Sequence, residues 1–146
     1  MTLTKLLLTL HLLGAFALAA GVTLRLIGAR MFEADGSAEN NATAGSLLRG
    51  PGALLYRGGA TLAFLAGMGL VSRTHHSFGD FWISASMMVW ILLFVTGDGF
   101  TNRHARFLES AAAGGDTQQR VGSVRTTASL EVVLVALLLI LMVWQP

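Results

Sequence analysis

Histidine and methionine are the residues of this chain whose types and spacing could hold a metal ion. His11 lies about five residues inside an apolar N-terminal stretch, and His75 and His76 stand together in a short polar segment. Four methionines fall where the apolar stretches described below would bring them to the same half of a membrane: Met68, Met87, Met88 and Met142. Imidazole and thioether groups suit copper, particularly Cu(I), and His or His/Met pairs also hold haem iron. The pattern therefore indicates a copper or haem site around His11, with His75 and His76 as further metal ligands.

A second interpretation of the same residues stays open. Methionine is a common filler of membrane helices, and a lone buried histidine often hydrogen-bonds a neighbouring backbone or hydroxyl group. Under that interpretation the methionines pack the helices and His11 is a satisfied core residue.

Four ionisable residues lie within or at the edges of the apolar stretches, two of each sign: Arg25, Arg57, Asp98 and Glu131. We place them together at the ends of their helices, where opposite charges would pair and the arginines would snorkel toward water. Binding of anionic lipid and a polar half-channel are the alternatives. No carboxylate is expected at mid-membrane, which disfavours ion-coupled transport by a lone protomer.

Other catalytic motifs are missing from the sequence. The chain has no cysteine, which excludes thiolate metal sites and thiol nucleophiles. It also has no HExxH, Walker A or GxSxG motif. Gly97-Asp98-Gly99 has the composition of a turn-like break at the end of the third apolar stretch. Any enzymatic activity would depend on a bound cofactor, so the sequence favours a protein that is not an enzyme.

The elements that would position these residues are membrane-spanning helices. Of the 146 residues, 53% are hydrophobic and 12% are charged, about half the charged fraction of a soluble domain. Since a spanning helix needs roughly 20 apolar residues, four stretches qualify or nearly qualify: 6–27, 53–71, 78–95 and 128–144. In lipid each backbone polar group must be satisfied within its own segment, which favours helices. The sequence predicts an all-α integral membrane four-helix bundle, with residues 1–146 as a single domain.

The first stretch could also be a cleavable signal peptide, with Ala17-Leu18-Ala19 as the cleavage motif. We expect a retained first helix, because the apolar run continues to Ile27.

The distribution of basic residues predicts the topology. An even number of spans places both termini and the 72–80 hairpin on one side, together with Lys5 and Arg73. The other eight of the ten basic residues lie on the opposite side: Arg25, Arg30, Arg49, Arg57, Arg103, Arg106, Arg120 and Arg125. By the positive-inside rule, both termini face outward and both long loops face the cytoplasm.

The two long connections differ in composition. Residues 33–50 are small, polar and rich in glycine, which is typical of a flexible loop. Residues 101–113 contain strong helix formers and are expected to continue the third helix, which Gly114-Gly115 would end.

Small residues form two regular series along the first two spans. They are Gly14, Gly21 and Gly28 in the first, and Gly59, Ala63 and Gly67 in the second. Such series let helix backbones approach closely in lipid, where dispersion contacts replace the hydrophobic effect. They predict packing inside one bundle; homodimerisation or docking on a larger complex is the alternative.

Three segments resemble a known family: LLLTLHLLGAFALAAG at the start, FTNRHARFLES after the third span, and VALLLILMVWQP at the end. Together they resemble the small bacterial four-span membrane proteins catalogued as domain of unknown function 2269. The histidine in the first helix is also similar to that of copper-resistance D-like membrane proteins and their haem-binding relatives. The resemblance implies a bacterial inner membrane location and His11 as a ligand. The chain departs from those relatives because no second histidine lies inside any span, which puts a bis-histidine haem in doubt.

Three functional hypotheses follow. The first is a non-enzymatic structural or accessory subunit of a membrane complex, with the lipid bilayer and other subunits or further copies of the chain as partners. The second is a haem- or copper-binding redox or metal-handling protein that uses His11. The third is a small transporter or channel formed by oligomerisation. Nucleic acid is not an expected partner, because the arginines stand beside apolar spans.

Overall fold

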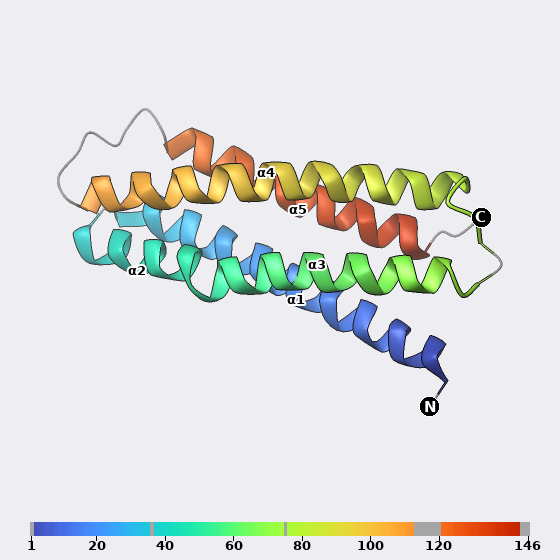
Figure 1. Cartoon of the computed structure of the whole chain (residues 1–146). Helices are drawn as coiled ribbons and strands as arrows, with labels where there is room; N and C mark the ends of the chain where they lie inside the picture. The colour runs from blue at the N-terminus through green and yellow to red at the C-terminus, as the bar shows by residue number, and fades with distance from the viewer. Residues whose placement is uncertain (1, 36, 75, 113–120, 144–146) are drawn as a thin grey trace.

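The computed structural model describes the backbone of residues 2–35, 37–74, 76–112 and 121–143, and most side chains of these residues outside 98–125. It contains five helices: α1 (Leu3–Asp35), α2 (Ala38–Arg49), α3 (Pro51–Val71), α4 (Phe81–Ala112) and α5 (Val121–Val143). Only Gly50 separates α2 from α3, so the helices form four antiparallel rods (Figure 1). Within the described ranges there is no strand. The predicted all-α helical bundle is therefore confirmed.

The two ends of the bundle differ in what they carry. The start of α1, the turn between α3 and α4, and the end of α5 lie at one end, which we call the terminal end (Figure 1). The end of α1, the start of α2, the end of α4 and the start of α5 lie at the other, which we call the loop end. This arrangement places α1 and α4 in one direction and α3 and α5 in the other.

The exterior of the bundle is apolar over most of its length. Three described stretches are long and apolar enough to cross a membrane, namely Leu3–Met31, Ala42–Val71 and Thr126–Val143, and the apolar stretch Phe81–Gly97 of α4 is shorter. Large side chains project outward, such as Phe16 at 73% exposed and Val143 at 82%. A soluble monomer rarely exposes contiguous apolar surface on this scale, so the helices indicate a protein of the membrane.

The segment predicted as a flexible loop, 33–50, is helical over most of its length. α1 continues to Asp35, and α2 then begins at Ala38, where the Ser37 side chain accepts a hydrogen bond from the backbone N–H of Asn40 at 3.3 Å. The loop prediction was wrong because it weighed composition alone. The capping serine and the contact of buried Leu48 with Gly28 of α1 both favour a helix.

Helix α4 also differs from the predicted third span. It begins at Phe81 rather than at residue 78, because residues 77–80 form a turn in which Asp80 accepts the backbone N–H of Ser77 at 3.0 Å. It then continues to Ala112, as the helix formers in 101–113 predicted. Gly114-Gly115 lies outside the described residues.

Helices α1 and α3 approach each other through glycine. A methyl group on Gly14 would lie 2.9 Å from the Gly59 carbonyl oxygen and 2.8 Å from Ala63 Cα. A methyl group on Gly21 would lie 2.6 Å from the Tyr56 backbone nitrogen. These distances are too short for a side chain, so the two backbones are in direct contact. Both small-residue series contact other helices of the same chain; Gly28 packs less tightly, since a methyl group there would lie 3.5 Å from the Leu48 side chain.

Helices α3 and α4 are joined instead by aromatic side chains. The ring of Trp90 stacks between Phe64 and Phe94, with centroid distances of 4.1 and 5.1 Å. Trp90 Nε1 donates a hydrogen bond to the carbonyl oxygen of Ala60 at 3.0 Å. Helix α3 thus packs against α4 through large aromatic rings here, whereas it packs against α1 through glycine.

Candidate functional site

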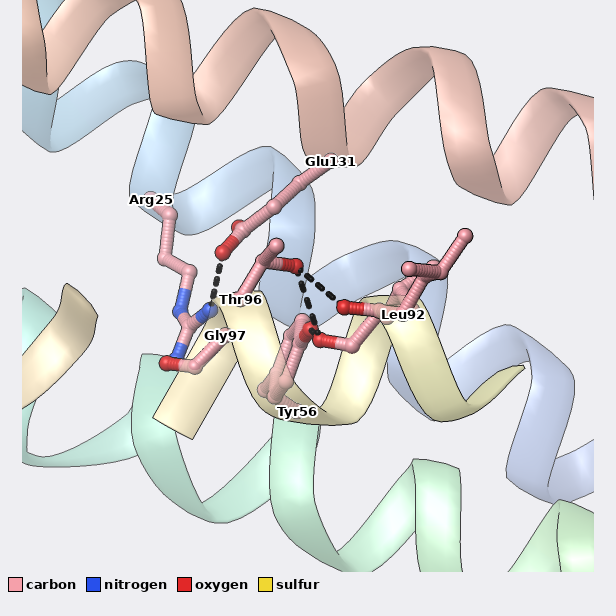
Figure 2. A network of polar contacts seen from close by, with 7 residues as sticks. Arg25, Tyr56, Leu92, Thr96, Gly97 and Glu131 are labelled. Atoms are coloured by element: carbon pink, nitrogen blue, oxygen red, sulfur yellow. Dashed lines mark hydrogen bonds and ion pairs between the residues drawn. The ribbon is translucent and has the colours of Figure 1, made fainter. Parts of the chain in front are cut away.

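A buried ion pair lies where all four rods meet. Arg25 of α1 donates from Nη1 to Oε1 of Glu131 of α5 at 2.8 Å, and each side chain is only 4% exposed (Figure 2). The other terminal nitrogen, Nη2, donates to the carbonyl oxygen of Gly97 in α4 at 3.2 Å. One guanidinium group therefore links three helices through charge-assisted hydrogen bonds.

The fourth rod contributes an aromatic ring. The guanidinium carbon of Arg25 lies 3.7 Å from the centroid of the Tyr56 ring, a cation–π geometry. Tyr56 of α3 is 1% exposed, and its hydroxyl donates to the carbonyl oxygen of Leu93. Thr96 Oγ1 donates to the same carbonyl at 3.2 Å and to that of Leu92 at 2.7 Å (Figure 2). The site thus combines one cation, one carboxylate, one phenol and backbone carbonyls of α4.

Gly97 makes this arrangement possible. A methyl group there would overlap the hydroxyl and ring carbons of Tyr56, so any larger residue would push the ring away from α4. The prediction of a turn-like break at Gly97-Asp98-Gly99 was wrong, since α4 runs through these positions without interruption. Glycine stands at residue 97 because another helix packs against it.

The site lies well inside the helices rather than at their ends. Glu131 is about 18 Å from Val143 and about 15 Å from Val121, at 1.5 Å per residue. Arg25 is about 15 Å from the loop-end terminus of α1. The placement of these charges at helix ends was wrong, because the helices extend beyond the apolar stretches that defined the predicted spans.

Of the other two predicted charges, only Arg57 has a described side chain. Arg57 follows Tyr56 in α3, but its side chain is exposed on the outer surface of the bundle. The backbone of Asp98 belongs to α4, and its side chain lies outside the described residues. Of the four predicted charges, the structure brings Arg25 and Glu131 together.

His11 lies in the contact between α1 and α3. Its Nδ1 is 2.7 Å from the carbonyl oxygen of Ala63, so Nδ1 carries the proton and donates it. The ring also packs over Gly67, where an added methyl group would lie 3.2 Å from Nδ1. Metal-binding histidines are commonly held in this way, with one ring nitrogen fixed on a backbone carbonyl and the other left to coordinate. The ring orientation of His11 therefore fits a ligand role as well as a packing role.

The remaining predicted ligands are more dispersed. Met68 and Met88 are 37% and 65% exposed, which places both at the exterior of the bundle, whereas Met87 and Met142 are half-buried. His76 is in the turn between α3 and α4, where Nδ1 lies 3.5 Å from Asp80 Oδ2. His75 lies outside the described residues. No group of three or more histidine and carboxylate side chains close enough to bind a metal occurs in the part of the chain that the structure describes.

Tyr56 and Gly97 were not predicted from the sequence as members of the site. Two signals were available in the sequence. One is a tyrosine directly before an intramembrane arginine, and the other is a glycine within an otherwise uninterrupted helix. Neither signal identifies its partner, because the contacts join residues 37 and 72 positions apart in the chain.

The fold and the site together define a helical membrane protein in which Arg25 and Glu131 form a buried ion pair among the described residues. Comparison with protein families, curated proteins and solved structures finds no match for this chain.

Proposed function

We propose that this chain is a non-enzymatic structural or accessory subunit of a complex in the bacterial inner membrane. The observation that supports the proposal is the linkage of all four rods by Arg25, whose charge and donors engage Glu131, Gly97 and Tyr56. A charge in a membrane interior marks a functional site by default. Here the two charges pair with each other, and Arg25 also contacts Gly97 and Tyr56, which fits a role in holding the helices in register.

The topology that we propose has both termini outside and both long connections in the cytoplasm. The loop end would then be cytoplasmic and the terminal end external. The arginine and lysine distribution supports this orientation.

The test is the size of the protein extracted from its native membrane in detergent-free polymer discs. A subunit would migrate as a defined assembly larger than its 15.5 kDa chain. A monodisperse single chain that carries no partner and forms no oligomer would refute the proposal. Expression of a variant without the ion pair, such as Glu131→Gln, would show whether assembly depends on the bundle being intact.

A haem- or copper-binding function is the second candidate, and the orientation of His11 favours it. Because Nδ1 is fixed on Ala63, Nε2 is the ring nitrogen that would coordinate the iron or copper ion. Optical spectra of the oxidised and dithionite-reduced protein, with elemental analysis of the same sample, test this candidate. A Soret band or stoichiometric copper that His11→Ala abolishes would support it, and an unchanged content in that variant would exclude His11 as the ligand.

A further inference from the structure

The turn that leads into α4 presents aromatic side chains on the outside of the bundle. Phe78 in this turn is 46% exposed, and Phe81 at the first position of α4 is 80% exposed. Trp82 follows directly and is half-buried. The three rings lie at the terminal end, where α3 and α4 are joined (Figure 1). Neighbouring exposed rings of this size mark a surface that contacts a membrane or another protein.

Hydrogen bonds fix the exposed position of Phe78. Asp80 Oδ2 accepts the backbone N–H of Ser77 at 3.0 Å, and the backbone N–H of Asp80 donates to the carbonyl oxygen of Ser77 at 3.0 Å. Ser84 Oγ in the first turn of α4 donates to the carbonyl oxygen of Phe78 at 2.8 Å. The turn is therefore tied to α4, and the outward direction of its aromatic residue belongs to the folded structure.

Phe81 continues an apolar face that runs along α4. Phe81, Met88 and Val95 are spaced by seven residues and are 80%, 65% and 65% exposed. Seven residues are close to two helical turns, so the three side chains point in nearly the same direction. In a bilayer this face meets lipid. The continuity of the face up to Phe81 favours lipid, rather than another protein, as the contact of the rings at its end.

The length of α4 determines which part of the lipid these rings meet. The apolar stretch Phe81–Gly97 is about 24 Å long, whereas the hydrocarbon layer is about 30 Å thick. A stretch shorter than the hydrocarbon draws the residues that flank it toward the membrane. The turn before α4 is thereby drawn into the zone between the lipid headgroups and the acyl chains.

We propose that Phe78, Phe81 and Trp82 anchor the start of α4 in the interface of the terminal-end leaflet, beside the glycerol and ester groups of the phospholipids. Tryptophan and phenylalanine are favoured in this zone, because their rings are apolar and the indole also offers one N–H donor to the ester oxygens. The anchor depends on membrane insertion. It is independent of the role as an accessory subunit and of the side of the membrane that the terminal end faces.

The test measures the depth of a nitroxide label by electron paramagnetic resonance, in the full chain reconstituted into phosphatidylcholine vesicles. The chain has no cysteine, so Gly79→Cys provides a single labelling site between the two phenylalanines. A Cβ at this position would meet only Ser77 Oγ, at 3.6 Å, an ordinary contact. Accessibility to oxygen and to a water-soluble nickel chelate gives the depth, calibrated with nitroxide lipids. We expect the label to lie deeper than a headgroup nitroxide and shallower than one on the acyl chain.

The double change Phe78→Ala/Phe81→Ala, made in the labelled chain, tests the rings themselves. We expect the label to move outward by about 5 Å, the smaller of the depths to which such side chains insert. Phe16→Ala is the matched control, because Phe16 is 73% exposed on α1 and distant from the turn. Its loss removes similar apolar surface and should leave the depth of the label unchanged.

Three results would overturn the proposal. A label outside the headgroup nitroxide in the otherwise unchanged chain would place the turn in water, and this measurement needs no aromatic variant to fold. An unchanged depth in the double variant would show that the rings do not hold the turn at the interface. An immobilised label that neither oxygen nor the nickel chelate reaches would show that a second copy of the chain, rather than lipid, covers the turn.

Discussion

Removal of one partner of the buried ion pair should destabilise the bundle more than any other single polar substitution in the described core. In Glu131→Gln the amide can still accept a hydrogen bond from Arg25, but the arginine charge loses its counter-ion in a site where both side chains are 4% exposed. Breaking a buried pair in this way costs about 3–5 kcal/mol. The retained hydrogen bond places the expected loss of unfolding free energy near the lower limit, about 3 kcal/mol.

The double variant Arg25→Met/Glu131→Leu separates the charge effect from packing. Replacement of both charges by apolar side chains of similar volume is often neutral or stabilising, so we expect this variant to be more stable than Glu131→Gln. The assay is unfolding in mixed micelles at increasing SDS fraction, followed by tryptophan fluorescence. Glu39→Gln is the matched control, since Glu39 is exposed on α2 and should change stability by less than about 0.5 kcal/mol.

Two outcomes would refute this reasoning. One is a loss below about 1 kcal/mol for Glu131→Gln, the size expected of a solvent-exposed pair. The other is additivity, in which Arg25→Met and Glu131→Leu measured singly sum to the effect of the double variant. Additivity would mean that the two residues do not interact in the folded protein.

Three further predictions use the same unfolding assay. Gly97→Ala should lower the unfolding free energy by about 1–3 kcal/mol, because its methyl group overlaps Tyr56. The control Gly58→Ala, whose methyl group meets no neighbour within 4 Å, should be neutral or slightly stabilising. Equal changes in stability for the two variants would show that α3 and α4 are not in contact at Gly97. Tyr56→Phe should lower the unfolding free energy by about 1 kcal/mol, because it removes the hydroxyl bond to the α4 backbone and keeps the ring under Arg25. Unchanged stability would argue against that hydrogen bond. Gly14→Val should separate α1 from α3, with a loss of at least about 2 kcal/mol, and wild-type stability in this variant would contradict the close backbone contact.

The spans and their packing residues could be predicted because they are local properties of the chain. Hydropathy over about 20 residues identifies helices long enough to cross a bilayer. Regular spacing of small residues identifies the faces on which helices approach. The helix within 33–50 was missed because composition alone favours a loop there. A serine cap and a tertiary contact with Gly28 stabilise the helix instead.

The sequence by itself determined that the chain is helical and apolar, and that it carries a few charges where charges are costly. Tertiary structure alone decided which charges meet. Arg25 and Arg57 are both arginines within apolar stretches and lie at similar depth. Arg25 nevertheless binds Glu131 in the core, whereas the side chain of Arg57 is exposed. The physical reason is rotation about the helix axis: side-chain direction changes by about 100° per residue. Which direction faces the core depends on the close α1–α3 contact and on Gly97, where the absence of a side chain admits Tyr56.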